Sequence, residues 1–398
     1  MPATRFDYDV TVVGGGPAGS TAATLLAQHG HRVLLLERDS HPRFHIGESM
    51  LPLSEPVVER LGIDWSAGNQ FKSGALFMDE AVGRQIFFPL SRQRRTYQIE
   101  RGPFDELLFR NAAAQGVETR ENEKVLKADC AEEGVTVSTQ AGSHRSRYLV
   151  DASGRSAFMG RAQGGIARIS NLGQFAVFSH YRDIPRNDTA DELFRTGTIY
   201  IPVVDIGWIW IIPLSGRRLS VGLVVQKARP AGSVEDLFRR YLGQSPVLRQ
   251  LLEGSEQDAP IRTEADFSYT NQTRYGLRYA CCGDAAGFLD PVFSSGVFLA
   301  FTGAARVADR VHQGLVSGTE ADPQLHAGDD DEYLLGFNTM RVFVERFYQS
   351  DMVHNLFFEA DQHPQLRDEI AQLLAGDLWS GVNHLQNRLL AGRHASHW

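Results

Sequence analysis

Gly14-Gly15-Gly16-Pro17-Ala18-Gly19 is the stretch that decides the fold. It has the G-x-G-x-x-G spacing and follows an apolar run at residues 8–13. It opens a segment, residues 17–28, whose apolar residues fall on one side of a helix. A second apolar run, residues 32–36, ends at the acidic Glu37. Strand, glycine turn, helix, strand and terminal carboxylate together predict a βαβ unit that binds a dinucleotide.

The glycines of this turn have separate tasks. Gly14 permits the tight turn, and Gly19 permits close packing of the helix on the strand. Gly16 lets a pyrophosphate approach the free N–H groups at the helix N-terminus. Glu37 can accept hydrogen bonds from both ribose hydroxyls, and a carboxylate there disfavours a 2′-phosphate. The motif by itself fits NAD and FAD equally.

Composition limits the class of protein. The chain has 398 residues and a formal net charge of −8, so two or three globular lobes are expected and nucleic acid is not an expected partner. Cys130, Cys281 and Cys282 form no C-x-x-C pair, which argues against a disulfide framework or a zinc site and fits a reducing cytoplasm. The histidines show no metal-ligand spacing, so no metal is expected. We expect no signal peptide and no membrane span.

Patterns along the rest of the chain predict further elements. Residues 103–116 have helical periodicity, whereas residues 71–90 and 174–225 are strand-rich, the latter with a hairpin turn at Ser215-Gly216. A short strand precedes Gly283-Asp284, and a long helix begins near Ser295. Residues 318–328 suggest a linker, and an apolar stripe over residues 333–347 predicts a helix packed on the core.

Three downstream segments favour FAD. The run C-G-D-A-A-G at residues 282–287 resembles the second FAD fingerprint of the two-domain flavin monooxygenase superfamily, whose aspartate, here Asp284, meets the ribityl chain. Arg101, in E-R-G-P-F-D, matches the superfamily's flavin-contacting arginine. D-A-S-G-R-S, beginning at Asp151, occupies the place of its middle Asp-Gly segment. These segments together span most of the first 310 residues of the chain.

The resemblance implies an α/β fold with a Rossmann-like FAD-binding domain, an inserted β-sheet domain and a C-terminal helical segment. We expect residues 1–70, 98–160 and 275–328 to form the FAD-binding domain. Residues 71–97 and 161–274 would form the substrate-side β-sheet domain, and residues 329–398 the helical region. The residues expected to bind the cofactor are Gly14, Gly16, Ala18, Gly19, Glu37, Arg38, Ser49, Arg101, Asp284, Gly296 and Val297.

Three other motifs resemble those of one branch, the flavin-dependent halogenases. W-x-W-x-I-P begins at Trp208, and F-x-x-P-x-x-S-x-G runs from Phe288 to Gly296 directly after the second fingerprint. K-x-G-A-x-F begins at Lys72, after H-I-G-E-S at residues 45–49. In that family, reduced FAD, O2 and a chloride or bromide ion give hypohalous acid. The acid then passes to a lysine that presents it to an aromatic ring.

The resemblance assigns roles to several residues. Lys72 would receive the oxidant, best as a buried amine of lowered pKa, because the neutral amine is the nucleophile; the alternative is a solvated surface lysine. Backbone N–H groups of Ser295 and Gly296 at a helix start would hold the halide, although Ser294 and Ser295 also suit an ordinary helix cap.

Four residues would form a wall between flavin and substrate. Trp208 and Trp210 fall on one face of a strand, where they could also be ordinary core residues. Pro291 and Phe293 complete the wall in the F-x-x-P motif. Such a wall would keep the substrate away from the flavin, which explains halogenation in place of hydroxylation.

One departure bears on the substrate. Tryptophan-acting halogenases have a glutamate where this chain has Phe293, so it resembles the phenol- and pyrrole-acting branch more closely. Glu48 and His45 are candidates for a substrate base, although a cofactor role suits them better. A basic segment, Arg92, Arg94 and Arg95, could dock an acidic carrier protein bearing a tethered substrate, but a solvated turn is the favoured interpretation.

Other functions remain open at this point. An FAD-dependent aromatic hydroxylase or oxidase is the principal alternative, followed by an ene-reductase acting on polyprenyl chains and a non-catalytic flavin-bound partner protein. The sequence has no second nucleotide-binding glycine motif, so a separate flavin reductase is expected to supply reduced FAD. The aromatic substrate, the halide preference and the oligomeric state are not determined by these patterns.

Overall fold

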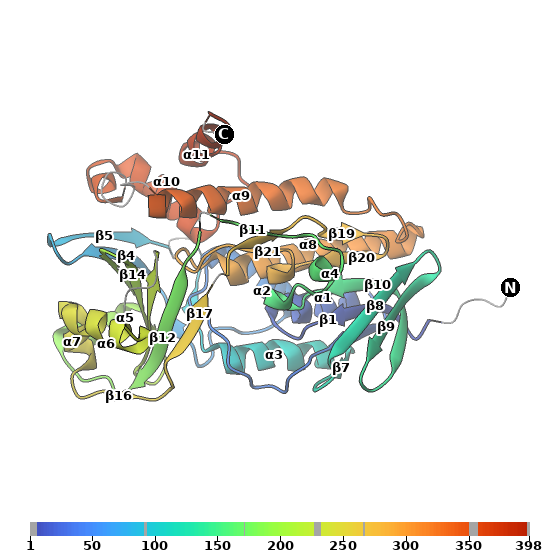
Figure 1. Cartoon of the computed structure of the whole chain (residues 1–398), viewed down its shortest axis with the longest axis horizontal. Coiled ribbons are helices and arrows are strands. Elements are labelled where there is room, and N and C mark those ends of the chain that lie inside the picture. Colours follow the sequence, from blue (N-terminus) through green and yellow to red (C-terminus); the bar gives the residue numbers. More distant parts are fainter. Residues whose placement is uncertain are drawn as a thin grey trace.

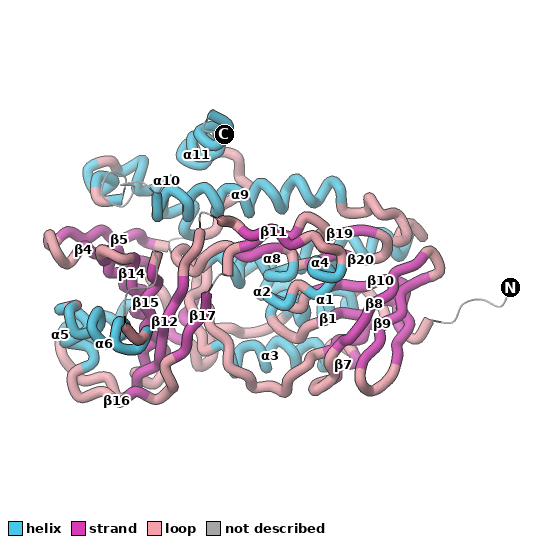
Figure 2. Tube along the Cα trace, in the orientation of Figure 1, coloured by secondary structure: helices cyan, strands magenta, loops and turns pink. Residues whose placement is uncertain are grey.

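The computed structural model describes residues 6–90, 94–170, 172–226, 232–265, 267–349 and 357–395. Strands gather in two regions, one around β10 and one around β12, and helix α9 (Ala327–Gln349) lies along one side of the molecule above both (Figure 1). Figure 2 shows helices beside each group of strands. The chain is therefore a mixed α/β protein, as its sequence predicts.

The first sheet contains the dinucleotide unit. Its order is β19-β20-β10-β1-β2-β7, in which β1 pairs in parallel with β10 and β2, while β8 and β9 form an antiparallel extension of β10. Its strands are β1 (Tyr8–Val13), β2 (Val33–Leu36), β7 (Glu118–Arg120), β8 (Val125–Ala131), β9 (Gly134–Thr139), β10 (Ser143–Asp151), β19 (Tyr275–Gly276) and β20 (Tyr279–Cys281). This parallel centre is the expected Rossmann-like core.

Helices pack against this sheet through a shared apolar cluster. Leu25 and Leu26 of α1, Leu108 of α3 and Phe301 of α8 meet Val10 of β1 in it. The helical segments of this half are α1 (Pro17–Gln28), η1 (Pro52–Ser54), α2 (Glu55–Leu61), α3 (Arg101–Ala114), η2 (Gly154–Ser156), α4 (Phe158–Ala162), η3 (Gly283–Ala285) and α8 (Ser295–Ser317). Helices α1 and α8 thus begin beside the strand ends at which a ligand would lie.

The second large sheet has the order β16-β12-β15-β14-β13-β4-β5, with β17 beside β12. Its strands are β4 (Gly74–Asp79), β5 (Arg84–Pro89), β12 (Phe175–Arg182), β13 (Ile199–Val204), β14 (Gly207–Leu214), β15 (Arg218–Val225), β16 (Glu256–Gln257) and β17 (Arg262–Ala265). Pairing of β14 with β15 confirms the hairpin at Ser215-Gly216. Strand β4 joins this sheet by parallel pairing with β13, far along the chain.

Each face of this sheet packs on helices. One face meets α5 (Asp188–Thr196), α6 (Val234–Gln244) and α7 (Pro246–Leu252). The other carries Trp208 and Trp210 and meets α9, α10 (Pro364–Ala375) and α11 (His384–Ala395), with η5 (Glu359–Gln362) between α9 and α10. The remaining strands, β3 (Gln70–Phe71), β6 (Tyr97–Gln98), β11 (Ile166–Arg168), β18 (Tyr269–Asn271) and β21 (Gly287–Phe288), form two small sheets.

Some helices begin where the sequence predicts, and others differ from the expectation. Helix α1 spans the predicted residues, whereas α3 begins at Arg101, two residues before the expected start. Helix α5 interrupts the stretch expected to be strand-rich, and the Asn187 side chain caps it by accepting from the Ala190 N–H at 2.8 Å. In the expected linker, Glu320 is buried and accepts hydrogen bonds from Arg147 and Arg278, so this segment is anchored to the core.

None of the described helices is both long enough and apolar enough to cross a membrane.

Candidate active site

The glycine turn between β1 and α1 brings three backbone segments together. Gly14 has φ +103°, and a Cβ there would lie 2.3 Å from the Ala152 carbonyl oxygen. A Cβ on Gly19 would lie 1.8 Å from the Gly14 carbonyl oxygen. At Gly16, by contrast, the nearest heavy atom to an added Cβ is the Arg43 guanidinium at 3.4 Å. The backbone at Gly16 is thus open on one side, which is the cradle that a pyrophosphate requires at the N-terminus of α1.

Glu37 organises the turn from the end of β2. Its carboxylate accepts hydrogen bonds from the Gly15 N–H at 2.8 Å and the Asp39 N–H at 3.0 Å, and the Arg43 guanidinium donates to it at 3.2 Å. Arg38 points elsewhere and pairs with Asp39 and the Ser156 hydroxyl. Glu37 therefore lies next to the glycine turn, where a ribose would meet it.

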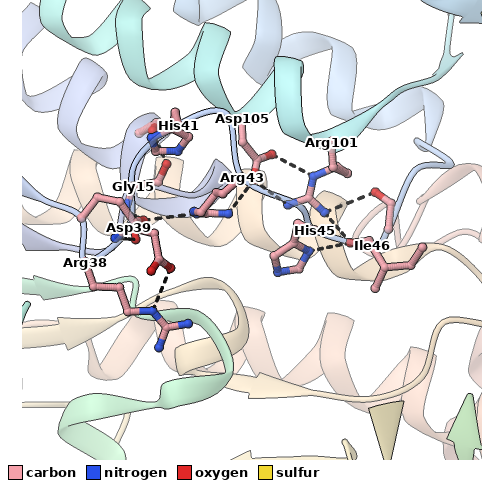
Figure 3. A network of polar contacts seen from close by, with 12 residues as sticks. Gly15, Arg38, Asp39, His41, Arg43, His45, Ile46, Arg101 and Asp105 are labelled. Atoms are coloured by element: carbon pink, nitrogen blue, oxygen red, sulfur yellow. Dashed lines mark hydrogen bonds and ion pairs between the residues drawn. The ribbon is translucent and has the colours of Figure 1, made fainter. Parts of the chain in front are cut away.

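Arg101 braces the loop that follows. Its guanidinium donates to both Asp105 carboxylate oxygens and to the carbonyls of Ile46 and Gly47 (Figure 3). Arg43 also donates to Asp105, at 3.3 Å, so the two arginines share one carboxylate. Neither Arg43 nor Asp105 is among the site residues expected from the sequence. The spacing of Arg101 and Asp105, one helical turn apart, was the signal available for the latter.

The loop ends in a buried acid–histidine pair. Glu48 Oε1 lies 2.8 Å from Nε2 of His180 on β12, and this contact raises the pKa of His180 against the opposing effect of burial. The other Glu48 oxygen and the Ser49 hydroxyl are buried without a hydrogen-bond partner. Burial and the nearby Arg101 lower the pKa of His45 to about 4, so His45 is neutral at pH 7. Two orphaned polar atoms in one loop fit a polar cofactor edge, because such atoms are rarely left unsatisfied.

Helix α8 opens beside the second glycine fingerprint. Its N-cap residue, Ser294, is in the left-handed conformation with φ +55° and makes no side-chain capping bond, so the ordinary serine cap is wrong. A small cavity is lined by Asp284, Ser295 and Gly296, among others. Burial raises the pKa of Asp284 to about 6, with Arg101 and Arg155 opposing the shift. The cavity thus brings the expected ribityl and halide residues to one place.

Val297 lies close to Gly47 and to the Arg101 guanidinium. It is partly buried against the core of the first sheet, and a Cβ on Gly47 would meet its Cγ2 at 3.9 Å and the Arg101 guanidinium at 3.0 Å. Ala18 is buried in the same core, beside Gly283 of the second fingerprint. These contacts place the two fingerprints against each other.

Lys72 lies in the short connection between β3 and β4 and is fully enclosed by the protein. Its side chain is 1% exposed, so a solvated surface lysine is wrong. Its ammonium nitrogen donates to the Met50 carbonyl at 2.8 Å, and its backbone N–H donates to the Thr96 carbonyl. Burial lowers the pKa of Lys72 to about 7, so about half of the molecules hold a neutral amine at neutral pH.

Three of the four expected wall residues, Trp208, Trp210 and Phe293, belong to one apolar cluster. Trp208 and Trp210 are 1% and 5% exposed, and their ring centroids are 6.0 Å apart. Phe293 is buried and its ring centroid lies 4.3 Å from that of Phe343 of α9, on which it stacks, while Pro291 is half-buried. These positions suit both a wall and ordinary core packing.

The basic segment proposed to meet a carrier protein is only partly described. Arg92 lies outside the described residues. Arg94 pairs with Glu55 at 3.3 Å, and Arg95 is exposed. Exposed pairing of this kind is common at solvated turns.

Comparison with known proteins assigns the chain to a family. A family model described as tryptophan halogenase matches residues 9–93 and 89–389. The 1H-pyrrole-2-carbonyl-[peptidyl-carrier protein] brominase of Pseudoalteromonas luteoviolacea is 32% identical, over 93% of this chain and 92% of that protein. The tryptophan 2-halogenase of Chondromyces crocatus is 34% identical, over 98% of this chain and 79% of that protein. The structure of the flavin-dependent brominase Bmp2 superimposes with a TM-score of 0.86 at 28% identity, covering 98% of each chain.

These matches span nearly the whole chain, and each named relative is a halogenase. They favour halogenation over the aromatic hydroxylase or oxidase of the same superfamily. Together with the glycine turn, the second fingerprint and the buried lysine, they show that the chain belongs to the tryptophan halogenase family and is a flavin-dependent halogenase, an oxidoreductase.

Proposed function

We propose that this enzyme uses reduced FAD, O2 and chloride or bromide to halogenate a pyrrole or phenol ring through Lys72. The observation that carries the proposal is the burial of Lys72, which lowers the pKa of its amine to about 7. An ammonium group has no lone pair to offer, so a lysine of ordinary pKa would be inert at neutral pH. The 2.8 Å hydrogen bond to the Met50 carbonyl fixes where the nitrogen lies.

The residues of the glycine turn would hold the cofactor. The open side of Gly16 and the N-terminus of α1 would receive the pyrophosphate, with Gly14, Ala18 and Gly19 shaping the backbone. Glu37 would meet the adenosine ribose, Asp284 the ribityl chain, and Ser49, Gly296 and Val297 the flavin ring. Arg101 would support the cofactor indirectly, by holding in place the loop whose Ile46 carbonyl it contacts. Arg38 would lie at the edge of the cofactor site, where it donates to the Ser156 hydroxyl. When bound, reduced FAD supplies two electrons and two protons, with which O2, a halide ion and one further proton give hypohalous acid and water.

The start of α8 would hold the halide. The backbone N–H groups of Ser295 and Gly296 belong to the first turn of a long helix, where N–H groups lack intrahelical partners and the helix dipole favours anions. The left-handed Ser294 turns the chain so that no side-chain cap occupies this position. The adjoining cavity lined by both residues gives a small ion room beside them.

The wall residues would separate the two half-reactions. Trp208, Trp210 and Phe293 belong to the apolar cluster beside the second sheet, and Pro291 lies in the loop before α8. Together they would place aromatic and aliphatic surface between the α8 cavity and Lys72. A substrate held behind this surface meets hypohalous acid at the lysine and not the flavin. The carbon–halogen bond then forms as the ring loses a proton.

The named relatives suggest the substrate and partners. The Pseudoalteromonas brominase acts, by its name, on a pyrrole-2-carbonyl group attached to a peptidyl carrier protein, and Phe293 leaves this chain without the glutamate of the tryptophan-acting enzymes. We infer an electron-rich pyrrole or phenol, free or attached to a carrier protein. A separate flavin reductase would supply reduced FAD.

The decisive experiment supplies chemically reduced FAD, oxygen and either chloride or bromide. Pyrrole-2-carbonyl on a peptidyl carrier, the free acid and a panel of phenols are offered in parallel, and products are followed by mass spectrometry. We expect the mass shift of a halogen on at least one substrate. Hydroxylation without halogen incorporation, at any halide concentration, would contradict the proposal and favour the aromatic hydroxylase.

A further inference from the structure

A hydrogen-bonded chain of three side chains crosses the largest apolar cluster of the protein. The Trp208 indole N–H donates to the Tyr348 hydroxyl oxygen at 2.7 Å. That hydroxyl lies 3.1 Å from both carboxylate oxygens of Asp290. The residues come from β14, from the last turn of α9, and from the loop between β21 and α8. Three separate parts of the molecule are thus tied together by two contacts.

The polar atoms of this chain complement one another. The Tyr348 oxygen accepts one hydrogen from the indole, and its own hydrogen donates to the carboxylate. The Val292 backbone N–H also donates to Asp290, at 2.8 Å. Among the described residues, no cation is paired with Asp290, and burial raises its pKa to about 7. A buried carboxyl group without a cation destabilises a core relative to an apolar side chain of similar size, so its presence calls for another reason.

The neighbouring tryptophan shows a different arrangement. Trp210 donates to the Ser220 hydroxyl at 3.1 Å, and Ser220 belongs to β15, the adjacent strand of the same sheet. Of the two indole hydrogen bonds, only that of Trp208, here called its tether, reaches a residue outside the sheet. It leads to Asp290, which lines the same cavity as Ser295 and Gly296. The orientation of the Trp208 ring is therefore fixed relative to the expected halide site and not merely within its own sheet.

We propose that Asp290 and Tyr348 are positioning residues that hold the Trp208 indole as the barrier between the halide cavity and the aromatic substrate, an inference that rests on the proposed function. An indole has two side-chain torsions, and a directional bond at its nitrogen selects one orientation of a ring that apolar contacts alone would fix less sharply. Without the Tyr348 hydroxyl, the ring would sample other orientations and oxidant would escape before reaching Lys72. Helix α9 would thereby become part of the active site through a single hydroxyl.

The test compares two Tyr→Phe variants of the same helix. Tyr348→Phe removes the tether, whereas Tyr333→Phe removes a buried hydroxyl that has no hydrogen-bond partner. Proteins containing 5-fluorotryptophan give a fluorine signal for each tryptophan, and Trp208→Phe assigns one of them. We expect Tyr348→Phe to shift or broaden the Trp208 signal even without FAD, and Tyr333→Phe to leave it in place.

Tyr348→Phe, Asp290→Asn and the unmodified enzyme are then compared in turnover; Tyr333→Phe serves the fluorine measurement alone, because Tyr333 lines the same cavity as Ser295 and Gly296. For each, the fraction of reduced FAD recovered as halogenated product is measured against hypohalous acid caught by a thioether trap, alongside the affinity for FAD. We expect Tyr348→Phe to lower the product fraction about fivefold or more with unchanged FAD affinity, and Asp290→Asn to act in the same direction, more weakly. An unchanged Trp208 signal or an unchanged product fraction in Tyr348→Phe overturns the inference. If the unmodified enzyme gives no halogenated product, the proposed function fails, and the fluorine signal alone then decides whether the tether orients Trp208.

Discussion

Replacing Lys72 with methionine is expected to abolish halogenation and, at the same time, to stabilise the folded protein. The activity is lost because methionine offers no amine to carry the oxidant. FAD binding and oxidation of reduced FAD with release of peroxide should remain, since Lys72 lies apart from the glycine turn and the α8 cavity. Product formation by mass spectrometry and peroxide release by a coupled assay measure the two effects separately.

The gain in stability follows from the pKa of Lys72. Its change from 10.5 to about 7 disfavours the protonated folded state, and each pKa unit corresponds to about 1.4 kcal/mol. At pH 7 the folded protein therefore carries a penalty of about 4 kcal/mol, from which the lost hydrogen bond to Met50 removes roughly 1–2 kcal/mol on substitution. We expect Lys72→Met to raise the free energy of unfolding by about 2 kcal/mol at neutral pH.

The stability difference between Lys72→Met and the unmodified enzyme should depend on pH, and this dependence is the control. The unfolded chain binds the Lys72 proton up to pH 10.5, whereas the folded chain loses it near pH 7, so the stability of the unmodified enzyme rises relative to the variant across this window. The difference between the two proteins, measured by denaturant titration, should shrink from pH 7 toward pH 10. A variant that is less stable than the unmodified enzyme at pH 7, or a constant difference, would contradict the buried, weakly basic amine.

Two alanine substitutions in the glycine turn are each expected to weaken FAD binding, but for different reasons. In Gly19→Ala the new Cβ would lie 1.8 Å from the Gly14 carbonyl oxygen, so backbone must move and the fold should lose about 3 kcal/mol or more. In Gly16→Ala the new Cβ meets only the end of the flexible Arg43 side chain, at 3.4 Å, so the fold should survive. That methyl group would still occupy the open side of the backbone where the pyrophosphate belongs.

We therefore expect Gly16→Ala to unfold at nearly the same temperature as the unmodified apoprotein and to bind FAD at least about tenfold more weakly, a change of about 1.4 kcal/mol. Gly19→Ala should lose both folding stability and FAD binding. Thermal unfolding without FAD and fluorescence titration with FAD separate the two. Normal FAD affinity in Gly16→Ala would show that the cofactor phosphates do not approach this backbone.

The features predictable from sequence are those with local causes. The first helix was predicted to the residue because the glycine turn and Pro17 define its start within a few positions. The tryptophan pair was placed on one face by the two-residue period of a strand. The motif that singled out Lys72 did not contain the reason for its pKa, because the burial depends on Met50 and Thr96, which lie elsewhere in the chain.

Contacts distant in sequence could not be predicted in the same way. Tyr348 is 140 positions from Trp208 and 58 from Asp290, and no periodicity connects them. His180 meets Glu48 only because β12 packs beside the loop at residues 45–49. Helix α5 was missed because its surroundings are strand-rich, although the Asn187 cap was a local signal for it. A single sequence defines strands and helices more readily than it defines which side chains they bring together.

The parallel pairing of β4 with β13 has a consequence for how the protein is made. Ala75 cannot find its neighbour until Ile199 has left the ribosome, so the hairpin following Lys72 stays undocked during much of synthesis. Sheets closed by such distant partners form slowly, and their apolar edges stay open to other chains in the meantime. Cooler expression or a lower concentration of nascent chains should thus improve recovery of the native enzyme, because each weakens association between such open edges.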